Sequence, residues 1–229
     1  MPQESTADSE IVHLTALQSI RRRPSMYIGD ESGKINPNTL VMEALCLAWS
    51  NACDRCCSRV SINLADDTVV IWDDGPGLDV FKQLSGSHSL IRAVFTEVHA
   101  CRDAKVNQSR DLCRVGIAIV TALSRETIYE TAQCGFVWRQ SFTAEDPNCK
   151  LEKLAPTTEQ WQRVTVIRDP AIFGPSKFTC DGVIEVHNAA SNGLPPYEKN
   201  RLPAADVRLT LTDDATNRCV VLNAGVTKC

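Results

Sequence analysis

The stretch ALQSIRRRPSMYIGD at residues 16–30, taken together with WDDGPGLDV at residues 72–80, decides the fold of this chain. The first stretch predicts the end of a helix, a basic run and a short extended piece that ends at Gly29. The second predicts a strand that runs into a tight turn, because Asp, Gly and Pro are favoured in turns. The helices and strands around these two stretches then indicate what the turn belongs to.

Hydrophobic periodicity outlines the other elements. Asn38 or Thr39 is expected to cap a long helix, since Asn and Thr side chains can accept the free N–H groups of a first turn. The helices are expected over residues 11–22, 38–56, 89–98 and 116–123, and the strands over residues 60–64, 69–72, 127–131, 135–142, 163–168, 206–212 and 218–223. This order predicts an α+β fold with a mostly antiparallel sheet layered against helices.

Length and charge limit the function classes. The chain has 229 residues, 43% of them hydrophobic, so it can bury one substantial core. We expect a loose arm over residues 1–10, one domain over residues 11–225 and a tail over residues 226–229. The net charge of −4, from 24 basic and 28 acidic residues, argues against a polyanion-binding surface and hence against direct nucleic-acid binding. The basic run at residues 21–23 is interpreted as a solvated helix end.

The chain has eleven cysteines, whose redox state depends on the cellular compartment of the protein. The sequence has no basic start followed by an apolar stretch, so we expect neither export nor a membrane span. We therefore expect a cytoplasmic protein with reduced thiols. Cys53 and Cys56 form one CxxC, with Cys57 adjacent. A zinc site would need further ligands from Cys46, Cys101, Cys113 or a histidine. Buried small hydrophobic residues are the favoured interpretation for most of the cysteines.

The chain resembles the GHKL-type ATPase domain of DNA gyrase B and of its counterpart in topoisomerase IV. RRRPSMYIGD at 21–30, the turn DDGPG at 73–77 and RDPAIF at 168–173 carry the resemblance, which covers nearly the whole chain. It implies a two-layer α/β sandwich with the helices on one face of the sheet. It also implies that Asp73 accepts a hydrogen bond from the adenine amino group and that Gly75 and Gly77 let the backbone approach the ring. The other expected nucleotide contacts are Leu78, Gly116 and Thr165.

The hydrolytic helix departs from the family pattern. The family has Glu-x-x-x-Asn, in which the Glu is the general base and the Asn oxygen holds Mg²⁺. In the preferred register Glu43 is the candidate base, and Leu47 stands where the metal ligand should be. In a second register Asn51 matches the asparagine, but Leu47 then replaces the glutamate. Leucine cannot coordinate Mg²⁺, which requires oxygen ligands. Glu43 is therefore either a doubtful base or a surface or helix-cap carboxylate.

The phosphate end departs as well. Residues 110–116 read RDLCRVG where the family has the glycine-rich lid GGLHGVG, so most of the backbone cradle for phosphates is missing. Arg110 and Arg114 supply side-chain charge, whereas Asp111 repels an anion. Before residue 168 the family has a Gly-Thr pair that supports adenine. Here Trp161 and Gln162 align with that pair, and Thr165 lies farther along the strand.

Three functions remain open from the sequence. The favoured hypothesis is a degenerate, non-hydrolysing member that binds ATP weakly without Mg²⁺ and acts by binding a gyrase or topoisomerase subunit or a small molecule in the old adenine pocket. The second is a working ATPase with Glu43 as base and the metal held by other oxygens such as Asn51. The third is a structural module whose pocket is filled, with Leu47 and Trp49 as the candidate plugs.

Overall fold

The computed structural model describes residues 14–84, 89–98, 100, 116–146, 150–193 and 207–222. Its centre is one sheet in the order β5-β4-β3-β6-β2-β1-β7-β8. The strands are β1 (Arg59–Ala65), β2 (Thr68–Asp73), β3 (Ser124–Gln133), β4 (Phe136–Phe142), β5 (Glu152–Pro156), β6 (Trp161–Arg168), β7 (Arg208–Asp213) and β8 (Arg218–Leu222). Among these described strands β1 and β7 pair in parallel, and the other neighbours pair antiparallel.

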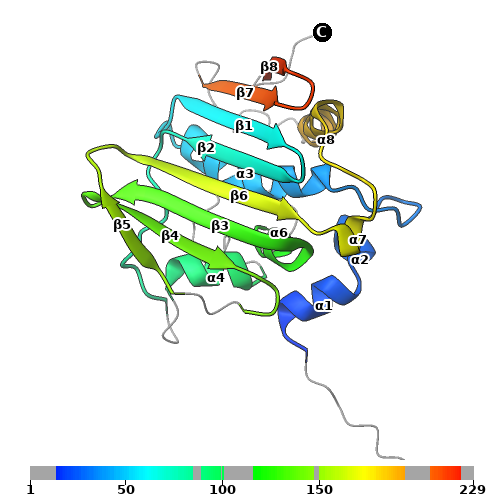
Figure 1. Ribbon diagram of the computed structural model, residues 1–229, viewed down its shortest axis with the longest axis horizontal. Helices are drawn as coiled ribbons and strands as arrows, with labels where there is room; N and C mark the ends of the chain where they lie inside the picture. The colour runs from blue at the N-terminus through cyan, green and yellow to red at the C-terminus, as the bar shows by residue number, and fades with distance from the viewer. Residues whose placement is uncertain are drawn as a thin grey trace, which may run out of the picture.

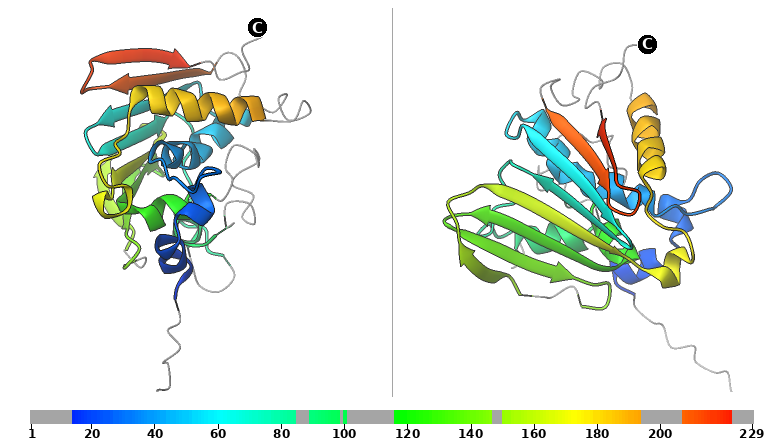
Figure 2. Two further views of the ribbon diagram at one scale, coloured as in Figure 1. Left: turned by 90° about the vertical axis from the view of Figure 1, so that its right-hand side faces the viewer. Right: turned by 45° about the horizontal axis from the view of Figure 1, so that its top comes forward.

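Helices cover one face of this sheet, as the views in Figures 1 and 2 make plain. The helices are α1 (Ala16–Arg22), α2 (Ser25–Ile28), α3 (Asn38–Cys53), α4 (Leu90–Thr96), α6 (Ala118–Leu123), α7 (Pro170–Phe173) and α8 (Cys180–Gly193). The expected α+β sandwich with a mostly antiparallel sheet is therefore confirmed. Among the described residues no helix is both long enough and apolar enough to cross a membrane.

Helix α3 runs through the middle of the helical layer and is buried on nearly all sides, from Leu40 to Ala52. The strand that follows it, β1, alternates between buried and partly exposed residues, and its Val60, Ile62 and Leu64 belong to the core. Because burial on all sides leaves no polar face, the polar side chains of α3 must find partners inside the protein. Two of them, Glu43 and Asn51, form the site considered below.

Several local expectations are corrected by the structure. Residues 25–28 form one helical turn instead of an extended piece, because Pro24 before them already has the helical φ of −60°. Neither expected residue is the cap of α3: the cap position is Pro37, which makes no side-chain hydrogen bond, and the side chain of Asn36 accepts the N–H of Asn38 at 2.9 Å. Strand β5 has every residue exposed and hence no alternation to detect. Helix α8 is a further element that the sequence pattern does not predict.

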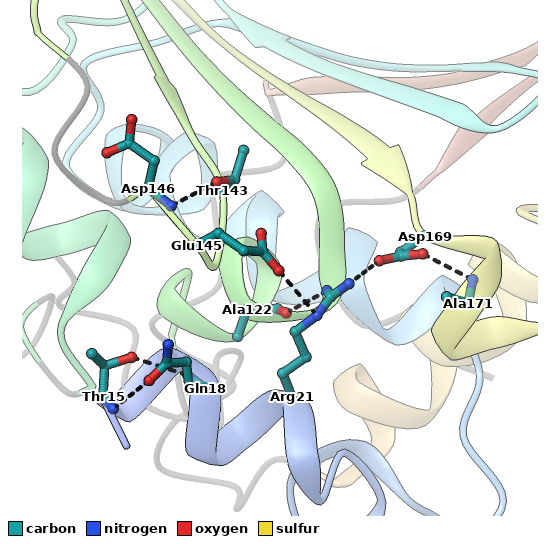
Figure 3. Close-up of polar contacts among 9 residues, drawn as sticks. All are labelled: Thr15, Gln18, Arg21, Ala122, Thr143, Glu145, Asp146, Asp169 and Ala171. Atoms are coloured by element: carbon teal, nitrogen blue, oxygen red, sulfur yellow. Dashed lines mark hydrogen bonds and ion pairs between the residues drawn. The ribbon is translucent and has the colours of Figure 1, made fainter. Parts of the chain in front are cut away.

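The basic run is not simply a solvated helix end, because Arg21 joins four elements (Figure 3). Its guanidinium donates to the carbonyl of Ala122 at the end of α6 at 3.1 Å and pairs with Asp169, which caps α7. Glu145, after β4, lies 3.6 Å away. Burial alone would raise the pKa of Asp169, but hydrogen bonds from Arg21 and the Ala171 N–H outweigh it and lower that pKa. Arg22 and Arg23 are exposed, as expected.

Replacing Arg21 with Ala should lower the free energy of unfolding by about 2–3 kcal/mol, because a mostly buried carboxylate would lose its cation and a helix-end carbonyl its donor. Urea unfolding followed by circular dichroism measures this change. Arg22→Ala is the matched control and should change stability by less than about 0.5 kcal/mol. Equal losses in both variants would contradict the assigned role of Arg21.

Candidate functional site

The candidate site begins at Asp73, the last residue of β2, whose side chain is almost fully buried at 1% exposure. Its Oδ1 accepts the side-chain N–H of Asn51 at 2.8 Å and the backbone N–H of Gly75 at 2.9 Å. The second N–H of the Asn51 amide donates to the carbonyl of Pro76 at 2.8 Å. One amide of α3 thus holds both the carboxylate and the turn that follows it.

Gln162 is a further hydrogen-bond partner of Asp73. The two residues are direct neighbours in the β2–β6 register, and both side chains are buried. Gln162 in turn accepts the hydroxyl of Tyr129 at 3.1 Å, and that hydroxyl accepts the N–H of Leu78 at 2.6 Å. Burial raises the pKa of Asp73 to about 6, against these hydrogen bonds, which lower it.

Gly75 and Gly77 are needed for contacts with the protein itself. A Cβ on Gly75 would lie 2.5 Å from the Asn51 side-chain nitrogen. A Cβ on Gly77 would lie 1.9 Å from the Thr131 hydroxyl on β3. Since real Cβ atoms do not approach other atoms so closely, each glycine lets the turn pack against a neighbouring side chain. Leu78, which follows them, is buried.

Glu43 lies in the middle of α3 and is 3% exposed, so it is neither a surface carboxylate nor a helix cap. Its Oε2 accepts the backbone N–H of Gly116 at 2.9 Å. Gly116 has a φ of +98°, a left-handed conformation that favours glycine, and stands just before α6. The contact therefore links α3 to the segment that the resemblance assigns to the end of the lid.

Leu47 lies between Glu43 and Asn51 at spacings of four residues, so the three share one face of α3. It is 3% exposed. Trp49 is buried too, but its ring packs edge-on against His187 of α8, with the centroids 6.0 Å apart. Leu47 is thus the apolar side chain on the α3 face that carries Glu43 and Asn51, whereas Trp49 packs toward α8.

Thr165 is not brought to Asp73. It pairs with Val70 and Ile128, three residues along β6 from Gln162, and strand alternation places it on the opposite face of the sheet. Residues 110–115 of the expected lid, with Arg110, Asp111 and Arg114, lie outside the described residues.

The polar network also includes Gln162, which the resemblance aligns with the pair that supports adenine, and Tyr129, which the sequence pattern does not single out. The alternation of Gln162 with Val164 and Val166 is the signal that could have placed Gln162 on the Asp73 side of the sheet. Tyr129 has no comparable signal, because its strand is buried over several consecutive residues.

Most of the cysteines that the structure describes are not buried, contrary to the expectation. Of the seven that the structure describes, only Cys46 and Cys180 are buried, and Cys56, Cys134 and Cys219 are exposed. Within the described part of the chain no group of three or more His, Cys, Asp or Glu side chains is arranged to hold a metal ion. Cys101 and Cys113 lie outside it.

The fold and the site define the class: a GHKL-type domain in which a long helix faces an aspartate at a sheet end. No model of a protein family matches the sequence. Among individual proteins, the chain is 31% identical over 186 residues to DNA gyrase B of Mycolicibacterium smegmatis and 29% identical over 185 residues to DNA gyrase B of Mycobacterium tuberculosis H37Ra. These matches cover 80% and 79% of this chain.

The solved 43K ATPase domain of Thermus thermophilus gyrase B, in complex with an aminocoumarin, shares the fold with a TM-score of 0.70. The match has 21% identity and covers 91% of this chain and 51% of that one. Sequence and fold together show a gyrase-B-like GHKL domain, as the sequence motifs predicted. The chain spans 27% of the length of the two mycobacterial relatives.

Asp73 gives a pH-dependent prediction. Because its folded pKa of about 6 exceeds the ordinary 3.8, the folded state holds the proton more tightly, and stability falls as pH rises through this window. The free energy of unfolding of the wild type minus that of Asp73→Asn should therefore decrease by about 2–3 kcal/mol from about pH 4 to about pH 7. Denaturant unfolding of both proteins across this range measures it, and a constant difference would contradict the raised pKa.

Proposed function

We propose that this chain is a degenerate gyrase-B-like domain that does not hydrolyse ATP and acts by binding another molecule. One observation carries the proposal: the carboxylate that should receive adenine is already hydrogen-bonded by the protein's own Asn51, Gly75 and Gln162. Asn51 of α3 and Gln162 of β6 thus hydrogen-bond to Asp73, as the amino group of a bound adenine would.

The adenine end argues for weak binding. An adenine amino group would compete for Asp73 with the side chain of Asn51, both of whose N–H groups are in use, and with Gly75 and Gln162. Leaving one buried polar group unpaired costs about 1–3 kcal/mol. The close packing of Gly77 against Thr131 further limits how far the turn can open without moving β3.

The phosphate end argues against turnover. Leu47 supplies no oxygen for Mg²⁺ between Glu43 and Asn51. Glu43 is buried and engaged by the N–H of Gly116, so its observed contact is that of an anchor rather than of a base aimed at water. Electrostatic stabilisation of the transferring phosphoryl group is usually the largest catalytic contribution, and the lid sequence lacks most of its glycines.

The partner is proposed from the resemblance. A gyrase or topoisomerase subunit that docks through the shared fold, or a small molecule that uses the remodelled adenine site, would suit a domain of this kind in the cytoplasm. The alternative is a working ATPase. It is favoured by the 2.9 Å contact between Glu43 and Gly116, which joins the two segments that the resemblance assigns to hydrolysis and the lid.

Nucleotide binding separates these functions. Isothermal titration with a non-hydrolysable ATP analogue should show weak binding that Mg²⁺ does not strengthen, because no metal ligand stands beside Glu43. Asp73→Asn should remove whatever adenine binding remains, since an amide group would replace one acceptor oxygen with a donor. Tight binding that requires Mg²⁺ would overturn the proposal, and binding unchanged by Asp73→Asn would place the ligand elsewhere.

Turnover supplies the second test. Phosphate release from ATP should be the same for the wild type and Glu43→Gln, in which the amide oxygen can still accept the Gly116 N–H and preserve the fold. The comparison uses protein purified identically, so that a contaminating ATPase contributes equally to both. A steady rate in the wild type that falls by about 100-fold or more in Glu43→Gln would identify a working general base.

A further inference from the structure

A pocket lies outside the candidate nucleotide site, where the end of α3 meets the start of β1. It has a volume of about 300 Å³ and is lined by side chains that include Arg55, Cys56, Cys57, Asp74 and Val207. Asp74 follows Asp73 in sequence, but it is held by the β1 side of the turn rather than by α3. The pocket therefore has a lining of its own, distinct from the residues around Asp73.

The turn that forms the wall of this pocket has a defined geometry. The N–H of Cys56 donates to the carbonyl of Asn51 at 2.8 Å, and the N–H of Arg55 donates to that of Ala52 at 3.2 Å. These two bonds make a Schellman motif, whose left-handed position is usually glycine. Here that position is Arg55, with a φ of +57°. The chain therefore keeps a long cationic side chain where glycine would cost less.

The two charged side chains in the pocket, Asp74 and Arg55, differ in how many partners they have. The carboxylate of Asp74 accepts the N–H and hydroxyl of Ser58, both at 2.8 Å, and the N–H and Nε of Arg59 at 2.9 and 3.1 Å. Its negative charge is thus satisfied by hydrogen bonds from Arg59 at the start of β1 and from Ser58 before it. By contrast, the guanidinium of Arg55 makes no ion pair with any described residue. Within the described part of the chain, the pocket therefore offers a cation without an ionic partner.

The two thiols at the pocket also differ. Cys56 is exposed, and its thiol makes one long contact of 3.4 Å with the carbonyl of Asp54. Cys57 is half-buried, and burial, followed by the charges of Asp73 and Asp74, raises the pKa of its thiol to about 12. Because the thiolate is the nucleophile in disulfide exchange, Cys57 stays unreactive and Cys56 is the accessible sulfur.

We propose that this pocket captures an acidic low-molecular-weight disulfide, whose carboxylate pairs with Arg55 while Cys56 forms a mixed disulfide with one half. The Cys56 thiolate attacks one sulfur of the disulfide, the sulfur–sulfur bond breaks, and the other half leaves as a thiolate that takes up the proton Cys56 released. Cys56 is oxidised, and the departing half is reduced. Cys57, as a protonated thiol, does not displace the bound half.

Three disulfides of different charge test the assignment on the full chain. Oxidised glutathione carries carboxylates, hydroxyethyl disulfide is neutral and cystamine is cationic. Peptide mapping by mass spectrometry gives the modification rate of Cys56 relative to Cys134, an exposed cysteine in the β3–β4 turn. This ratio should be about two- to fivefold higher for oxidised glutathione than for hydroxyethyl disulfide, as expected for one exposed charge pair, and lowest for cystamine.

Arg55→Gly is the matched variant, because glycine adopts the left-handed turn without strain and removes only the charged side chain. It should remove the preference for oxidised glutathione over hydroxyethyl disulfide, whereas Arg55→Lys should retain that preference. The proposal is overturned if the ratio does not depend on reagent charge, or if it survives in Arg55→Gly. It is also overturned if Cys56 forms an internal disulfide with Cys53 instead of a mixed one. A single cooperative thermal transition at or above the wild-type temperature shows that each variant keeps the fold.

Discussion

A carboxylate that is almost fully buried must be given hydrogen-bond donors, and Asp73 obtains them from three separate elements. Asn51 comes from α3, Gly75 from the turn itself and Gln162 from β6. The long helix, the sheet end and the turn are therefore fixed relative to one another at one point. The same hydrogen bonds that stabilise this point engage the carboxylate that the resemblance assigns to adenine.

The opposite end of the helical layer is organised around a cation. Arg21 joins α1 to the Ala122 carbonyl in the last turn of α6, to the cap of α7 and to the segment after β4. Glu43 ties α3 to the residue before α6. Each of these contacts places a charged or amide side chain of a helix against backbone or a cap on another element. A few polar contacts, some buried and some partly exposed, thus link helices that pack on an apolar core.

Much of the fold could be predicted because it rests on periodicity. The alternation in β1 and β2 and the helical spacing around residues 16–22 have direct counterparts in the structure. The errors occur where periodicity carries no information. Strand β5 is exposed throughout and α2 is a single turn. The partners of Arg21 are about 100 or more residues away, at Ala122 and Asp169, so no local pattern indicates its burial.

The sequence by itself determined the family resemblance, the position of the Asp73 turn and the presence of Leu47 four residues after Glu43, because each depends on residue identity at a fixed spacing. Only the tertiary structure decided what those residues touch. The packing of α3, β2 and β6 decides whether Glu43 lies on the surface or is buried. It also decides whether Asn51 and Gln162 donate hydrogen bonds to Asp73. Hydrogen bonding between segments far apart in the chain is set by packing, which spacing along the sequence does not encode.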